Sequence, residues 1–172
     1  MIKLLGALLI IAAGTAFGFA QSRRLRERPL QIRRLLIMLQ QLETEIAYGV
    51  VPLPEALAKL GRQTAEPLGG WLQETAARLG GDEPSTVRDV WERTVAAYWP
   101  GTAMKEAEKE TIVRLGHSLG ATDRADQLKH LRLAAAQLTG FEAEAADERR
   151  RYETMWKSLG LLGGALIVVM LY

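Results

Sequence analysis

The sequence predicts an all-α protein: a cytoplasmic bundle of about six helices flanked by N- and C-terminal transmembrane helices. Both ends of the chain are strongly apolar. Through the charged middle, apolar residues recur at three- and four-residue steps, and no stretch alternates apolar and polar residues as a half-buried strand would. Proline and glycine punctuate this pattern at intervals typical of helices. We therefore predict a transmembrane helix over 1–20, a cytoplasmic helical bundle over 21–156 and a second transmembrane helix over 157–172.

The composition excludes several kinds of chemistry. The 172 residues carry 22 basic and 20 acidic side chains, and a formal net charge of +2 gives no global case for nucleic-acid binding. The absence of cysteine excludes disulfides, thiolate metal sites and cysteine nucleophiles. No phosphate-binding loop, GxGxxG, HExxH or nucleophile elbow occurs. We therefore predict a protein that is not an enzyme and that holds no cofactor.

The first apolar segment is IKLLGALLIIAAGTAFGFA, residues 2–20, and only Lys3 in it is charged. About 20 such residues in a helix span the roughly 30 Å hydrocarbon core of a bilayer. A cleaved signal peptide is the alternative, because Gly18-Phe19-Ala20 weakly resembles a cleavage site. The length of the run and the arginine-rich segment that follows, RRLRER at 23–28, favour an uncleaved span.

The last apolar segment, LGLLGGALIVVMLY at 159–172, carries no charge. Extending it back to Met155 brings it near the lower limit of about 17 residues for a span. Trp156 and Tyr172 then lie at opposite ends, where interfacial aromatic residues are found. The alternative is a core helix of a soluble domain. The segment's place at the chain terminus and its small residues favour the span.

Basic residues flank both predicted spans on the side that faces the middle of the chain. By the positive-inside rule, the middle is then cytoplasmic and both termini lie outside. Each span also contains a GxxxG pattern, which brings helix backbones close together in membranes. Two interpretations of these positions remain: a role in membrane packing, or simply the high frequency of glycine in membrane helices. The candidate packing residues are Gly14, Gly18, Gly160 and Gly164.

Helix boundaries in the middle are predicted from proline, glycine and capping residues. Pro29 opens the first helix and Gly49 ends it in a left-handed conformation; Pro54 opens the second, which closes at Gly61. Pro67 precedes the third, which ends at Gly80–Gly81, and Pro84–Ser85 open the fourth, which ends at Pro100–Gly101. The fifth covers about 103–119, with Gly120 just past its end, and the sixth starts at Thr122 or Asp123.

The sixth predicted helix has no proline after it. It either runs on into the second span, giving one rod of up to about 50 residues and roughly 75 Å, or bends at Gly140 or Gly160. The short loops predict that neighbouring helices are antiparallel. Trp71, Trp91 and Trp99 sit at helical spacings and are predicted to lie in the core. The charged segment that holds Glu106, Glu108 and Glu110 is predicted to be a solvated face.

Both histidines of the chain lie in GHSLGATDRADQLKHL, residues 116–131. Two imidazoles and two carboxylates are a ligand set for a metal, so one hypothesis is a membrane-anchored metal-dependent enzyme using His117, Asp123, Asp126 and His130. The favoured interpretation is a tight helical hairpin, with a cap near Asp123 and Asp126 in the positive first turn. The candidate hairpin or partner surface comprises His117, Gly120, Asp123, Arg124, Asp126 and His130.

Five stretches together resemble one known family. They are the N-terminal MIKLLGALLI, ERPLQIRRL at 27–35, LETEIAYGVVPLPEAL at 42–57, LGHSLGATDRADQLKHLRLAAAQL at 115–138 and KSLGLLGGALI at 157–167. They are similar to the stage III sporulation protein AB family of endospore-forming bacteria, and the resemblance covers essentially the whole chain. The AYGVVPLPEAL segment is also similar to the helical domain of the inner-membrane platform protein of type II secretion and type IV pilus systems.

The resemblance implies a scaffold in the mother-cell membrane around the forespore, within the channel complex between the two cells. It implies contact with a cytoplasmic secretion-type ATPase, stage III sporulation protein AA, and with other subunits of the same complex. The lipid bilayer is the remaining expected partner. Platform proteins carry two such helical domains and this chain has room for one, so a homo-oligomer is left open. A membrane-tethered signalling adaptor is a further alternative.

Overall fold

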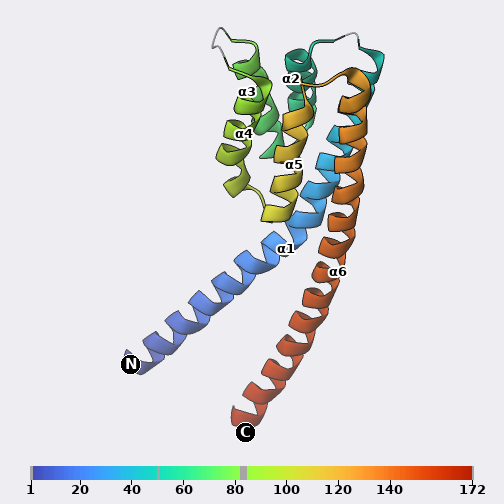
Figure 1. Cartoon of the computed structure of the whole chain (residues 1–172). Coiled ribbons are helices and arrows are strands. Elements are labelled where there is room, and N and C mark those ends of the chain that lie inside the picture. The colour runs from blue at the N-terminus through green and yellow to red at the C-terminus, as the bar shows by residue number, and fades with distance from the viewer. Residues whose placement is uncertain (1, 50, 82–84, 172) are drawn as a thin grey trace.

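The computed structural model describes residues 2–49, 51–81 and 85–171, and the side chains of 23–49, 51–81 and 85–152. All regular elements in these residues are helical, which confirms the predicted all-α class (Figure 1). They are α1 (Ile2–Tyr48), α2 (Leu53–Gln63), α3 (Leu68–Leu79), α4 (Val87–Tyr98), the 3-10 helix η1 (Trp99–Gly101), α5 (Glu106–Ser118) and α6 (Arg124–Leu171).

The helices form an up-and-down bundle in which each one packs against the next along the chain. The long helices α1 and α6 pack antiparallel and close the bundle on one side (Figure 1). We call the end that holds Arg28 and Glu148 the base, and the end that holds Tyr48 and Arg124 the tip. Short connections account for the antiparallel order, as the sequence predicts.

The predicted spans lie outside the residues whose side chains are described, as do Gly14, Gly18, Gly160 and Gly164. A search of the described residues for a helix both long and apolar enough to cross a bilayer found none.

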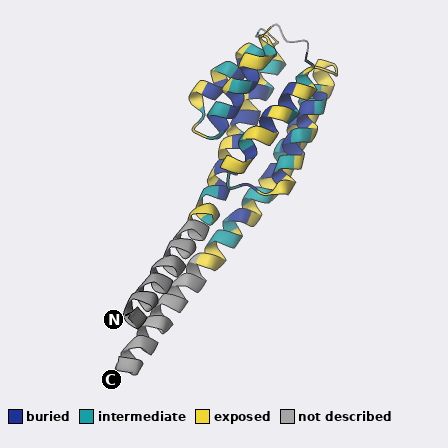
Figure 2. Ribbon diagram, turned by 90° about the vertical axis from the view of Figure 1, so that its left-hand side faces the viewer, coloured by how far each residue is buried: buried dark blue, intermediate teal, exposed yellow. Residues whose placement is uncertain are grey.

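Tryptophans build the centre of the core. Trp71 and Trp91 pack edge to face with ring centroids 4.9 Å apart, a favourable geometry for aromatic pairs. Trp91 Nε1 donates to the carbonyl oxygen of Ile112 at 2.8 Å, and Trp71 Nε1 donates to Thr94 Oγ1 at 3.2 Å. Trp99 is buried as well, so the predicted burial of all three tryptophans is confirmed. Figure 2 shows the buried residues on the inward faces of the helices.

Two glycines permit close helix packing. A Cβ at Gly116 would lie 2.1 Å from Cδ1 of Trp91, so α5 approaches α4 only because this position has no side chain. Gly61, predicted to end the second helix, lies inside α2 instead. A Cβ there would be 3.0 Å from the carbonyl oxygen of Gly69, so Gly61 serves the contact with α3 and does not terminate a helix.

Several predicted helix ends are confirmed. Gly49 and Gly120 have φ values of 62° and 79°, the left-handed conformation that glycine adopts without strain. Of the two candidate caps of the last helix, Asp123 fills the role, because its Oδ1 accepts a 2.8 Å hydrogen bond from the N–H of Asp126. Thr122 instead donates its hydroxyl hydrogen to the carbonyl oxygen of Ser118.

Two predicted helix starts are wrong. The first helix does not begin at Pro29: α1 continues through it. Proline costs the helix one hydrogen bond, but the continuous helix keeps Arg28 on the same buried stripe as Ile32 and Leu35. The fourth helix begins at Val87 and not at Ser85, because Thr86 Oγ1 accepts a hydrogen bond from the N–H of Asp89 at 3.2 Å. Pro84, the other residue predicted to open this helix, lies outside the described residues.

The sixth helix is continuous. It runs unbroken from Arg124 to Leu171, through both Gly140 and Gly160. A Cβ at Gly140 would meet no atom within 4 Å, so this glycine serves no close contact.

Candidate functional site

A buried ion pair joins α1 to α5 at the base of the bundle. Arg28 is 4% exposed and Glu108 is fully buried. Nε and Nη2 of Arg28 donate to Oε1 of Glu108 at 2.9 and 2.6 Å. The other oxygen, Oε2, accepts the N–H of Lys105 at 2.9 Å and so caps the start of α5. Both carboxylate oxygens are thus satisfied, as a buried charge requires.

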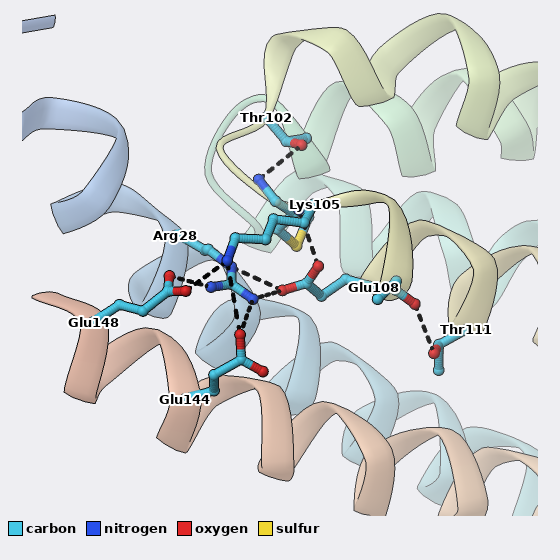
Figure 3. A network of polar contacts seen from close by, with 9 residues as sticks. Arg28, Thr102, Lys105, Glu108, Thr111, Glu144 and Glu148 are labelled. Atoms are coloured by element: carbon cyan, nitrogen blue, oxygen red, sulfur yellow. Dashed lines mark hydrogen bonds and ion pairs between the residues drawn. The ribbon is translucent and has the colours of Figure 1, made fainter. Parts of the chain in front are cut away.

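Helix α6 completes this site with two further carboxylates (Figure 3). Oε2 of Glu148 accepts from Nη1 of Arg28 at 2.7 Å, and its Oε1 lies 2.6 Å from Nζ of Lys105. Oε1 of Glu144 lies 3.6 Å from Nη2 of Arg28. We call these five residues, Arg28, Lys105, Glu108, Glu144 and Glu148, the base clamp. It ties α1, α5 and α6 together where the two long helices leave the bundle.

Electrostatics favour the ionised form of the clamp. The hydrogen bond from Lys105 lowers the pKa of Glu148 against the opposing effect of burial, and the charge of Arg28 lowers this pKa further. Each clamp carboxylate faces a cationic nitrogen. Such an arrangement fixes the spacing of helices and offers no unoccupied base for proton transfer.

The base clamp corrects two predictions made from the sequence. Glu108 is not part of a solvated face, and Arg28 is not simply one more arginine of the basic cluster. The sequence does contain a signal for both. Glu108 falls on the apolar stripe of α5 with Ile112 and Leu115, and Arg28 falls on the stripe of α1. A charged residue at a core position requires a partner, although the stripe does not identify it.

The two histidines of the predicted hairpin face different neighbours. Nε2 of His117 lies 2.5 Å from Oε1 of Glu92 on α4. The hydrogen bond from Arg88, followed by that from His117, lowers the pKa of Glu92. His130 is exposed and lines a hollow of about 200 Å³ between α5 and α6, beside Arg114.

The remaining hairpin residues build the tip. Asp123 caps α6, and Nε of Arg124 donates to the carbonyl oxygen of Ile46 at 2.7 Å, in the last turn of α1. A cation at that position favours the helix end. Gly120 makes the turn, and Asp126 is exposed in the first turn of α6. In the described part of the chain, no group of three or more His, Cys, Asp or Glu residues is arranged to hold a metal ion. The hypothesis of a metal-dependent enzyme therefore has no support in the geometry.

Comparisons with known proteins agree with this architecture. The family model of stage III sporulation protein AB matches residues 3–172. Stage III sporulation protein AB of Bacillus subtilis (strain 168) is 38% identical over 173 residues, covering 99% of each chain. A solved structure of stage III sporulation protein AB is 34% identical, covers 72% of this chain and 96% of its own, and superposes with a TM-score of 0.68. The chain therefore belongs to the stage III sporulation protein AB family.

Proposed function

We propose that this chain is a non-enzymatic membrane scaffold of the channel complex between mother cell and forespore. Family membership over nearly the full length supports a role in sporulation. The segments 1–20 and 157–172 anchor it in the mother-cell membrane around the forespore, with the bundle in the cytoplasm and both termini outside. The apolar character of both segments and the arginines beside them support this topology.

The base clamp is the observation that carries the scaffold role. It binds α1 to α6 through Arg28 and Glu148, and both to α5 through Glu108. The two chain segments that enter and leave the membrane are thereby joined to one rigid bundle. A subunit that positions a motor at a membrane needs such a junction, whereas an enzyme needs an accessible reactive group.

We further propose that the tip of the bundle, the end remote from the anchors, holds the cytoplasmic ATPase, stage III sporulation protein AA, in the manner of a secretion-system platform protein. Asp123, Arg124, Asp126 and His130 are exposed there and offer charges of both signs. Charged groups of this kind steer association and set its specificity. Other subunits of the complex, including further copies of this chain, would contact the remaining faces.

Photo-crosslinking in sporulating cells tests the docking. A photoreactive amino acid replaces Asp126 at the tip or, as the matched control, Arg26 at the base; both side chains are exposed. We expect a crosslink to the ATPase from position 126 and none from position 26. Reversal of this pattern, or no crosslink from either position in a strain that assembles the complex, would refute docking at the tip.

Cysteine accessibility tests the topology separately. A cysteine in place of exposed Arg62 should resist membrane-impermeant reagents in intact cells and react after permeabilisation. Labelling in intact cells would overturn the cytoplasmic placement of the bundle.

A further inference from the structure

A cleft of about 530 Å³ opens at the base of the bundle, between α1 and the loops that precede α3 and α5. The side chains of Arg23, Glu27, Gln31 and Arg34 line one wall, and Glu66 lies on the other. The α1 residues are spaced four, four and three apart, so they share one helix face. The cleft is separate from the base clamp, and the proposed scaffold role does not use it.

Gln31 places an unused hydrogen-bond donor in this cleft. The side chain is 5% exposed, and its Oε1 accepts the N–H of Ala103 at 2.7 Å. Because a backbone N–H must meet the amide oxygen, the orientation of the amide is fixed. The NH₂ group then faces away from Ala103, and it has no hydrogen-bond partner among the described residues.

Arg34 adds a cation that is not balanced within the described residues. It is exposed and makes no ion pair there, whereas its neighbour Arg33 pairs with Glu142 at 2.7 Å. Of the two cleft carboxylates, Glu27 accepts from Nε of Arg23 at 2.7 Å, and Glu66 accepts the N–H of Gly70 at 3.2 Å. Each carboxylate keeps acceptor capacity for a further donor.

We propose that the cleft binds the headgroup of an ethanolamine phospholipid. The phosphate would accept hydrogen bonds from the guanidinium of Arg34 and the amide of Gln31, since arginine matches phosphate geometry well. The ammonium group would donate to Glu27 and Glu66. A ligand with a single negative charge and a hydrogen-bonding cation complements a wall that carries charges of both signs. A purely anionic ligand would be repelled by the carboxylates of Glu27 and Glu66.

A membrane lipid is the favoured source, because Arg23 lies only three residues after the end of the first predicted span. This source depends on the membrane attachment proposed above, whereas the contact between phosphate, Arg34 and Gln31 does not. The test is therefore done with the purified full chain in detergent micelles, without the ATPase. The result of this lipid-binding test does not depend on whether the tip binds the ATPase.

Calorimetric titrations compare dihexanoyl phosphatidylethanolamine, dihexanoyl phosphatidylcholine, glycerophosphoethanolamine and inorganic phosphate. We expect the ethanolamine lipid to bind more tightly than the choline lipid, because a quaternary ammonium donates no hydrogen bond. Tighter binding of the lipid than of glycerophosphoethanolamine would support a membrane source, and equal binding would support a soluble headgroup. Equal binding of the choline and ethanolamine lipids, or no binding of any of these probes, would overturn the proposal.

Matched variants locate the binding. Arg34→Ala and Gln31→Glu should each weaken ethanolamine-lipid binding about tenfold or more, the usual effect of losing a hydrogen bond to a charged group. Gln31→Glu keeps an oxygen for the N–H of Ala103 but loses the donor. Arg33 is the exposed neighbour of Arg34, and Arg33→Ala should bind the ethanolamine lipid like the parent chain. If Gln31→Glu fails to fold, the test rests on Arg34→Ala, whose substitution is at an exposed position. Unchanged lipid binding by Arg34→Ala would contradict the proposal.

Discussion

Oε1 of Glu108 lies 2.6 Å from Nη2 of Arg28, although 80 residues separate the two positions and both side chains are buried. Removing two charges from water costs several kcal/mol each, so this pair adds little net stability over an apolar contact. Its effect is to fix where α1 meets α5, because each charge is strongly unfavourable in any packing that separates it from the other. The predictions start from this pair.

Arg28→Ala should destabilise the bundle by about 3–5 kcal/mol, since it leaves the carboxylate of Glu108 buried without its partner. Urea unfolding of the full chain in detergent, followed by the fluorescence of the buried tryptophans, measures this change. Arg33→Ala is the control: its ion pair with Glu142 is 67% exposed on the arginine side, and its loss should cost at most about 1 kcal/mol.

A double variant separates specificity from stability. Arg28→Met with Glu108→Leu removes both charges, so it should be much more stable than Arg28→Ala alone. A double variant as unstable as the single one would mean that the pair stabilises the bundle by more than avoiding an orphaned charge.

Acid should weaken the base clamp through Glu148. Its pKa is lowered in the folded chain, chiefly by the hydrogen bond from Lys105 and also by the charge of Arg28. The stabilisation is therefore present above the usual carboxyl value of 4.5 and is lost as the pH falls through the lower folded-state pKa. The difference in melting temperature between the parent chain and Glu148→Gln should be largest near neutral pH and shrink below 4.5. Glu110→Gln, at an exposed position, is the control for the loss of one surface carboxylate.

Two glycine-to-alanine changes should have opposite signs. Gly116→Ala places a Cβ 2.1 Å from Cδ1 of Trp91, and the overpacking should cost about 1–3 kcal/mol. Gly140→Ala meets nothing within 4 Å and should stabilise α6 by about 0.5–1 kcal/mol, because alanine loses less backbone entropy in a helix. Thermal melts of both variants check this. Equal effects would mean that α4 and α5 are not in close contact at Trp91.

Asp123 should act as a helix cap and not as a metal ligand. Asp123→Ala should cost about 0.5–2 kcal/mol, while Asp123→Asn should be nearly neutral, because asparagine also caps well. Melting temperatures measured with and without a chelator separate the two roles. A loss of stability in the chelator that either substitution abolishes would revive the metal hypothesis.

Local chemistry explains what the sequence predicts well. Gly49, Gly120 and Asp123 act within one turn of a helix end, so their roles can be identified without knowing what packs nearby. The burial of the tryptophans follows from the sequence because large aromatic side chains at helical spacing are normally buried. The all-α class follows from periodicity that extends over the whole middle of the chain.

Long-range packing explains what the sequence does not predict. Gly61 and Pro29 resemble helix boundaries, but α3 packs against the first and α1 continues through the second. Glu108 cannot be matched to Arg28 from a helical pattern, because the partner is chosen by how α1 and α5 approach each other. Gln31 gains its role in the same way, from the N–H of Ala103 in a distant loop.

The unbroken course of α6 makes it a lever. From Glu148 in the base clamp to Arg124 at the tip, the helix rises about 36 Å. A tilt of α6 by about ten degrees at the base would therefore displace its end at the tip by roughly 6 Å, close to the rise of one helical turn. Nε of Arg124 donates a hydrogen bond to the carbonyl oxygen of Ile46 at the end of α1, so the two long helices would move together. Under the membrane attachment and ATPase docking proposed above, a force on the tip would be transmitted to the base, where the chain continues into the predicted spans.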